Sequence, residues 1–314
     1  MEESRTMKGQ PILKSLSLDF NDRSPAANRR RRIVWTQRAR HLTQIGFGLF
    51  IIAGSIAHQT AVTDGATPSI DALCPFGGVE TLWRFLSSGG QYVPKTHLSN
   101  LVLLAGLVIG TLIAGGAFCG WICPFGAIQD MLNGIRKRLG IRPVELPARL
   151  DRILRYGRFV TLALILYQTI SLTKLWFADI DPYRTLFGLE WLFEFNLLTS
   201  WPAYLATITV LIGSFFVERA WCRYLCPLGG VISVLGRFSL LRIRRSGDAC
   251  TQCGLCARPC PVKLEVNKAK VISSNCIGCL ACVETCPRRS ALEVKLAPAW
   301  LLAPRPDTLQ PVKP

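Results

Sequence analysis

The stretch FCGWICPFG at residues 118–126 returns in altered form as WCRYLCPLG at residues 221–229. Each copy carries two cysteines four residues apart followed by a proline, and each copy ends a long apolar segment. Helical residues four apart share one face, and a proline ends or bends the helix just beyond the second cysteine. The repeat therefore predicts two related helix hairpins, each with a pair of cysteines where its apolar helix ends.

The composition of the 314-residue chain is that of a membrane protein. Hydrophobic residues make up 50% of the chain and charged residues only 18%, which leaves too little polar surface for an ordinary soluble protein of this length. The net charge of +17 would suggest nucleic-acid binding in a soluble chain. Here the arginines cluster beside apolar segments, where they set membrane orientation instead.

Four segments are apolar and long enough to cross a hydrocarbon core, which takes about 20 helical residues. They are approximately residues 41–62, 98–121, 159–177 and 197–217. Basic residues cluster before the first, between the second and third, and after the fourth, whereas the other two loops hold only Arg84, Lys95 and Arg184. Both chain ends are therefore expected in the cytoplasm. Within the second segment, the four-residue spacing of Gly106 and Gly110 predicts a close helix–helix contact.

Eight of the 13 cysteines crowd into residues 250–286, in two runs of metal-ligand spacing. Residues 250–261 read CTQCGLCARPCP, and residues 276–287 read CIGCLACVETCP. In this C-x2-C-x2-C-x3-C-P spacing, three thiolates wrap one 4Fe–4S cluster and the fourth reaches across to the other cluster. One cluster is expected on Cys250, Cys253, Cys256 and Cys286, and the other on Cys276, Cys279, Cys282 and Cys260. Two full copies with the terminal proline argue against a structural zinc module.

The predicted fold is a polytopic α-helical membrane protein of about four spans in two repeated hairpins, joined to a small α+β domain of the two-cluster bacterial ferredoxin type. Residues 1–40 are a basic segment left disordered, 41–240 the transmembrane region, 241–297 the ferredoxin domain and 298–314 a tail. Apolar pieces at 240–243 and 291–296 are expected to supply strands. Paired clusters without a nearby substrate motif indicate an electron-transfer subunit rather than a stand-alone enzyme.

The hairpin cysteines are a candidate redox or metal site. Both pairs follow even-numbered spans, so they share a depth near the cytoplasmic surface, and pseudo-symmetry would bring together Cys119, Cys123, Cys222 and Cys226. Three interpretations stay open. The four thiolates hold a soft metal or a further iron–sulfur centre, they cycle between dithiol and disulfide, or they are buried small hydrophobes.

Residues on the predicted outer side carry weaker signals. Cys74 stands before a proline and is a ligand, a redox thiol or a turn residue. His58 and His97 lie on adjacent spans and raise the idea of haem or quinol binding, although interfacial histidines are commoner. Glu80 and Glu190 are repeat-related carboxylates that quinol oxidation would use as proton acceptors.

Apolar hairpins ending in C-x3-C-P, followed by two ferredoxin motifs, resemble the membrane ferredoxin family that includes NapH, MauN and YccM, over roughly residues 40–290. The same module recurs in NosR and in the copper-handling CcoG and FixG. The resemblance implies a multi-pass inner-membrane protein with a cytoplasmic ferredoxin domain. It would pass electrons between a quinone pool or cytoplasmic donor and a partner redox enzyme. The alternative is a copper-binding and copper-reducing assembly factor of the CcoG type.

Overall fold

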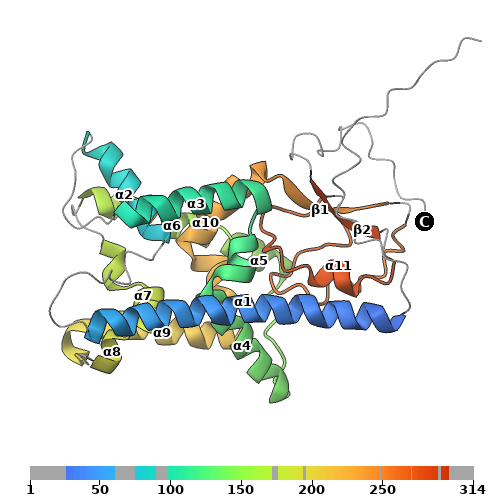
Figure 1. Ribbon diagram of the computed structural model, residues 1–314, viewed down its shortest axis with the longest axis horizontal. Coiled ribbons are helices and arrows are strands. Elements are labelled where there is room, and N and C mark those ends of the chain that lie inside the picture. Colours follow the sequence, from blue (N-terminus) through green and yellow to red (C-terminus); the bar gives the residue numbers. More distant parts are fainter. Residues whose placement is uncertain are drawn as a thin grey trace, which may run out of the picture.

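A computed structural model describes residues 26–60, 75–89, 98–171, 176–193, 196–247, 249–269, 271–288 and 291–296. Cys74 and His97 lie outside these ranges, and the side chain of Glu190 is not described. Figure 1 shows a helical bundle at one end of the molecule and a small α+β domain at the other. The bundle contains the hairpin cysteines, and the α+β domain contains the two C-terminal cysteine runs.

The bundle is built from two repeats of the same order of elements. The first comprises α1 (Ala26–Thr60), α2 (Pro75–Ser87), α3 (Leu98–Ala114), the π-helical turn η3 (Phe118–Ile122) and α4 (Pro124–Arg138). The second comprises α6 (Gly157–Ser171), η4 (Trp176–Asp179), α7 (Pro182–Phe187), α8 (Glu190–Phe193), α9 (Leu197–Phe216), the π-helical turn η5 (Trp221–Leu225) and α10 (Pro227–Leu235). The short helix α5 (Ala148–Leu154) joins them, and η6 (Gly236–Phe238) leads to the α+β domain.

The two repeats interlock. Helix α4 of the first repeat packs on α9 of the second, and α10 of the second packs on α3 of the first. In the same reciprocal way α1 contacts α7, and α6 contacts α2. Two layers result, one with α1, α4 and α9 and one with α3, α6 and α10 (Figure 1). This exchange of contacts is what a pseudo-twofold relation between the repeats produces.

The prediction of four membrane spans is not confirmed. Among the described residues, Trp35–Thr60 and Leu197–Phe216 are the helices long and apolar enough to cross a membrane. Helix α3 has 17 residues and α6 has 15. The predicted second span is interrupted at Gly115, whose φ of +61° ends α3 before the π-helical turn begins. A left-handed glycine at a helix end is not visible in an apolar run of sequence.

The first helix begins earlier than predicted. Residues 26–40 were expected to be disordered, but α1 starts at Ala26. Its N-terminal part lies against the α+β domain, where Gln37 Nε2 donates to Cys279 O (3.1 Å) and to Glu284 Oε2 (2.9 Å). One turn later, Arg40 pairs with Asp130 of α4. Partners far away in the chain, rather than local apolar periodicity, hold this polar segment in place.

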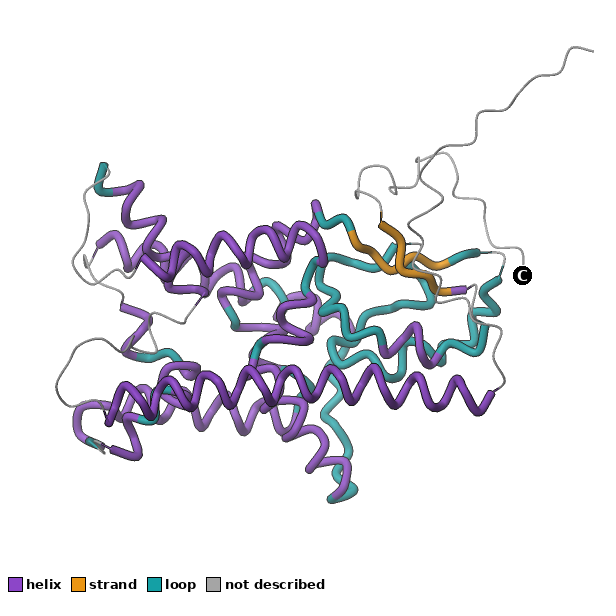
Figure 2. Tube along the Cα trace, viewed as in Figure 1, coloured by secondary structure: helices purple, strands orange, loops and turns teal. Residues whose placement is uncertain are grey.

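The α+β domain has the strands that the apolar pieces predict. Strand β1 (Leu241–Arg245) pairs antiparallel with β2 (Leu292–Leu296), with Ile243 opposite Val294. Loops make up most of the rest, together with the short helix α11 (Ala281–Thr285), as Figure 2 shows. The hydrophobic core combines aliphatic residues with cysteines, namely Ile243, Val266, Ile272, Ala291, Leu292, Cys256, Cys282 and Cys286. A core completed by potential metal ligands couples folding of this domain to metal binding.

Candidate metal centres

Both hairpin cysteine pairs are held by the same local structure. The first cysteine of each pair, Cys119 or Cys222, lies in a π-helical turn. The N–H of the second cysteine closes that turn on the carbonyl oxygen five residues earlier, at 3.0 Å for Cys123 and 2.8 Å for Cys226. Both second cysteines have φ −62°, with ψ 114° and 115°. The proline that follows begins the next helix, where its missing N–H costs nothing.

Helix N-termini point at the second cysteine of each pair. Gly229 N donates to Cys226 Sγ (3.4 Å) at the start of α10. Cys123 has the same N-cap position at the start of α4, where its side chain makes no capping hydrogen bond. Free N–H groups and the positive end of a helix favour a thiolate. Sulfur atoms that accept N–H bonds are also what tunes an iron–sulfur cluster.

The two pairs meet inside the bundle. Cys119 and Cys123 approach Cys222 and Cys226 there from the two π-helical turns. All four line one cavity of about 180 Å³ whose other walls are mainly aromatic and aliphatic. About 10–15 Å³ of such space holds one water, so this cavity has room for a polyatomic group.

A buried amide contacts this quartet. Gln129 Nε2, on the fully buried side chain of Gln129, donates to Cys222 Sγ at 3.0 Å. Ser214 Oγ of α9 donates in turn to Gln129 Oε1 (3.2 Å), which fixes the amide with its nitrogen toward the sulfur. Such outer partners orient ligands and tune the metal that the ligands hold.

A buried ion cluster holds the backbone of Cys119 in place. Arg219 is 1% exposed and donates from Nε and Nη2 to the two oxygens of Asp130, at 2.8 and 2.6 Å. Its Nη1 donates to Cys119 O (3.0 Å). Burial acts to raise the pKa of Asp130, but Arg219 and Arg40 hold it below its ordinary value. The cluster links α1, α4 and the turn before η5.

The structure brings the eight C-terminal cysteines together in two groups. Burial raises the pKa of Cys256, and the neighbours that raise it further are Cys286, Cys250 and Cys253. Burial raises the pKa of Cys282 in the same way, and the neighbours there are Cys276, Cys279 and Cys260. Every cysteine within the described ranges is a free thiol.

The two cysteine loops share an unusual backbone that suits wrapping around a cluster. The second and fourth residues after the first cysteine have positive φ in each loop. They are Gln252 (54°) and Gly254 (72°) in one, and Gly278 (62°) and Leu280 (59°) in the other. Left-handed Gln and Leu are uncommon and indicate a backbone shaped for a site. Gly278 N also points at Cys276 Sγ (3.4 Å). The residues present therefore fit 4Fe–4S clusters.

No cysteine group is arranged around a single ion. Within the described ranges, no three or more His, Cys, Asp or Glu side chains are placed to hold one metal ion.

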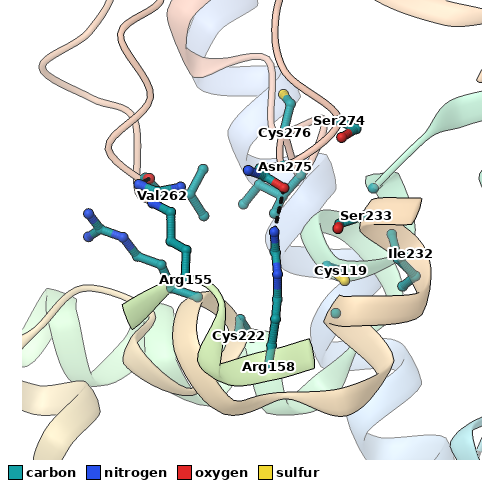
Figure 3. A pocket seen from close by; sticks show the side chains of 14 residues that line it. Cys119, Arg155, Arg158, Cys222, Ile232, Ser233, Val262, Ser274, Asn275 and Cys276 are labelled. Carbon is teal, nitrogen blue, oxygen red and sulfur yellow. Dashed lines mark hydrogen bonds between the residues drawn. The ribbon is translucent and has the colours of Figure 1, made fainter. Parts of the chain in front are cut away.

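The second ferredoxin loop lies directly on the first hairpin pair. Cys119 packs against the buried group that contains Cys260, Val262, Ile277 and Cys279. Trp121 Nε1 donates to Gly278 O (3.0 Å). Figure 3 shows Cys119 and Cys276 around one pocket, which Arg158 crosses to reach Asn275 Oδ1 at 2.6 Å. In the first ferredoxin loop, Cys253 is exposed.

Of the outer-side candidates whose side chains the structure describes, His58 and Glu80, neither lines the cysteine cavity. His58 is exposed near the end of α1. Glu80 is buried and accepts a hydrogen bond from Thr169 Oγ1 (3.0 Å), away from the cysteine cavity. Sequence reasoning overlooked Gln129, Asp130 and Arg219. Only Arg219 could have been singled out from the sequence, because it is a charged residue directly after an apolar segment.

Comparison with known proteins gives the same picture. Residues 96–142 and 199–246 match the family described as "4Fe-4S binding domain", and residues 242–287 match "4Fe-4S dicluster domain". The putative electron transport protein YccM of Escherichia coli is 32% identical over 231 residues, which are 72% of this chain and 64% of YccM. The ferredoxin-type protein NapH of Haemophilus influenzae is 31% identical over 207 residues, 62% of this chain and 68% of NapH.

Other relatives are longer. Protein NirI of Paracoccus denitrificans is 31% identical over 186 residues, which are 58% of this chain and 26% of NirI. The chain thus spans less than two thirds of YccM and about a quarter of NirI. No solved structure matches the chain.

Proposed function

Since the chain belongs to the family of ferredoxin-type iron–sulfur proteins that includes NapH and YccM, we propose that it is a membrane-bound electron-transfer subunit. It passes electrons between a quinone pool or a cytoplasmic donor and a partner redox enzyme. Two 4Fe–4S clusters occupy the C-terminal quartets. A third redox centre occupies the hairpin quartet of Cys119, Cys123, Cys222 and Cys226.

The observation that carries this proposal is the contact between the hairpin quartet and the ferredoxin domain. Cys119 packs against Cys279 and Ile277, and the second quartet shares its core with Cys256 and Cys286 of the first. Cys253 of the first quartet then reaches the surface. A continuous series of thiol groups thus runs from the interior of the bundle to the surface of the α+β domain. Electron transfer requires such a series, whereas a structural role does not.

An iron–sulfur cluster is the group that suits the hairpin quartet best. Each of the segments that match the 4Fe–4S binding family, 96–142 and 199–246, contains one cysteine pair. The N–H groups of Gly229 and Gln129 point at sulfur, as they do around protein-bound clusters. The CcoG-type alternative places copper here, since soft thiolates suit Cu(I). The N–H groups that donate to Cys226 and Cys222 favour the cluster.

The outward surface of the bundle supports four membrane spans, and the arginine clusters of the sequence support both ends in the cytoplasm. Large apolar side chains are exposed on each of the four long helices, for example Phe50 on α1, Val102 on α3, Leu164 on α6 and Ile208 on α9. Exposed apolar surface of this extent marks contact with lipid or with a partner. The short helices α3 and α6 would then cross the membrane together with the turns that continue them at their ends.

The cysteine cavity supports a lipid-soluble electron donor or acceptor. Its wall includes Phe47 and Phe50 of α1, which are also exposed on the outward face of that helix. An aromatic, apolar cavity that opens toward the lipid side of α1 suits a quinone ring. A quinone reaching the cavity would meet the cysteine quartet directly.

The experiment that tests this function uses proteoliposomes in which a lipid-soluble quinone oxidises the pre-reduced clusters. Replacing Cys119 and Cys222 by serine is expected to leave the iron and sulfide of the ferredoxin domain intact and to slow oxidation by the quinone. Oxidation by a water-soluble acceptor, which reaches Cys253, should be unchanged. Equal quinone rates in the variant and the wild type would contradict the role of the hairpin quartet. Copper bound by the wild type and lost from the variant would favour the alternative.

A further inference from the structure

The two repeats differ at two positions beside their first cysteines. Three residues before the first cysteine, the first repeat has Gly116 and the second has Arg219. Directly after that cysteine, the first repeat has Gly120 and the second has Arg223. Between these positions and beyond them the π-helical turns are alike, down to the ψ value of the second cysteine. The backbones differ just before the turns, where Arg219 has a left-handed φ of 53° and the left-handed residue of the first repeat is Gly115 instead of Gly116.

The two glycines of the first repeat form the surface on which the ferredoxin loop lies. A Cβ atom at Gly116 would lie 2.3 Å from Cys276 O, and one at Gly120 would lie 2.1 Å from Ile277 O. No side chain fits at either position, because the loop backbone occupies its place. Gln44 Nε2, from a fully buried side chain of α1, donates to Gly120 O (2.8 Å) and holds the turn from behind.

The two arginines of the second repeat fill the corresponding surface with side chains. Arg219 donates to both oxygens of Asp130. Arg223 pairs with Asp151 of α5 at 2.5 Å. Both arginines are more than nine-tenths buried, so these side chains are fixed parts of the bundle. Cys222 lines the same pocket as Cys119 and Cys276 (Figure 3), but the side chain of Arg223 also lines it, at the position where the first repeat leaves space for the loop beside Gly120.

We propose that the pseudo-symmetric site has a single electron exit, through Cys119 and the glycine surface to the loop of Cys276–Cys279. The arginine pair closes the equivalent path beside Cys222. One electron crosses this contact at a time, and the centre on the hairpin quartet loses or gains the electron that the cluster of Cys276, Cys279, Cys282 and Cys260 gains or loses. No proton or covalent bond changes hands. This inference rests on the proposed third centre.

Arg158 of α6 also reaches the ferredoxin loop, at Asn275, but within the two π-helical turns the hydrogen bond to the loop comes from the first repeat. Trp121 Nε1 donates to Gly278 O within the ferredoxin loop. Its counterpart in the second repeat is Tyr224, whose hydroxyl donates to Asp151 Oδ1 (2.6 Å) within the bundle. The aromatic residue at the equivalent position of each turn thus donates to the ferredoxin loop in the first repeat and to the buried ion pair in the second.

The test uses matched variants of the full-length, anaerobically purified protein. Trp121→Phe and Tyr224→Phe each remove one hydrogen-bond donor and keep the ring. Gly120→Ala inserts a methyl group into the loop contact, whereas Gly106→Ala inserts one where nothing lies within 4 Å. The readout is the magnetic interaction between the third centre and the nearer ferredoxin cluster, measured by electron paramagnetic resonance in the fully reduced state, with iron and sulfide content as the control.

We expect Trp121→Phe to weaken that interaction and Gly120→Ala to abolish it, while Tyr224→Phe and Gly106→Ala leave it as in the wild type. If Gly120→Ala loses its clusters, the comparison of Trp121→Phe with Tyr224→Phe still tests the proposal. Equal effects of these two variants, or an unchanged interaction in Trp121→Phe, would overturn the single exit. Absence of a third centre from the wild type would overturn the proposed third centre as well as the single exit. Failure of the single exit alone would leave the third centre in place, so the two results can be distinguished.

Discussion

At the scale of single residues, Asp130 connects α4 with two other parts of the bundle. It receives hydrogen bonds from Arg219 in the turn before η5 and pairs with Arg40 of α1. Both arginines are buried, so the carboxylate is their shared counter-charge. Removal of one partner from a buried ion cluster leaves uncompensated charge, which costs far more than the pair itself contributes. The position of Cys119, whose carbonyl Arg219 binds, therefore depends on Asp130.

Replacing Asp130 by alanine should destabilise the bundle by about 3–5 kcal/mol, the usual cost of breaking a buried ion pair. Thermal unfolding in detergent, followed by circular dichroism, measures this directly. The control is Lys268→Ala, which breaks an exposed pair with Glu265 and should change stability by about 0–1 kcal/mol. Similar midpoints for Asp130→Ala and the wild type would show that the ion cluster is not required.

The same carboxylate predicts a pH dependence. The pKa of Asp130 lies below its ordinary value in the folded protein, so its stabilising effect is complete above about pH 4, the usual Asp pKa. The effect is lost as the pH falls through the lowered pKa. The difference in unfolding midpoint between the wild type and Asp130→Asn should therefore stay constant above about pH 4 and shrink below it. A difference that changes between neutral pH and about pH 5 would contradict this assignment.

Gln129 is the residue most directly placed to tune the hairpin centre. Gln129→Leu keeps the volume and removes the N–H that points at Cys222 Sγ. Losses of such outer partners typically lower metal affinity or activity about 10- to 100-fold, and fewer donors to sulfur should lower the reduction potential. Redox titration followed by electron paramagnetic resonance measures the potential. Gln59→Leu, which removes a distant bond to Gly188 O, is the control and should have no effect.

At the scale of elements, the π-helical turn followed by proline decides where the cysteines point. The sequence predicts the hairpins and the pairing of Cys119 and Cys123, because spacing and proline are visible in the chain. The predicted α-helical continuation to residue 121 is wrong, because the left-handed Gly115 ends α3 first. The expected contact at Gly106 and Gly110 is also wrong, since open space faces both. The close approach occurs instead at Gly116 and Gly120, against a domain that the local sequence does not reveal.

Helix α1 joins the two domains, and Gln37 is its main polar contact with the α+β domain. Gln37→Ala removes the bonds to Cys279 O and Glu284, each worth about 0.5–1.5 kcal/mol. We expect faster proteolytic cleavage of the α+β domain with an unchanged bundle. Limited trypsin digestion of the purified protein tests this, with Gln59→Ala as the matched control near the other end of α1. Equal cleavage rates would show that α1 does not hold the domain.

At the scale of the whole molecule, two interlocked repeats create one buried quartet, and a ferredoxin domain lies on one side of it. The spacing alone predicts the eight ferredoxin cysteines and their grouping into two quartets, which stays a prediction. The meeting of the hairpin pairs followed from the repeat. The sequence does not predict which repeat the ferredoxin domain contacts. That choice depends on glycine in one repeat and arginine in the other, and the importance of these positions is visible only once the contact is known.

The central claim is that the hairpin quartet holds a third redox centre beside the ferredoxin clusters. The most direct test is iron, copper and acid-labile sulfide content, with electron paramagnetic resonance during stepwise reduction. It compares the wild type with a variant that has serine at Cys119, Cys123, Cys222 and Cys226. We predict that the variant keeps two cubane signals and loses a third iron–sulfur signal together with its iron and sulfide. Identical metal and sulfide contents in the two proteins would contradict the claim.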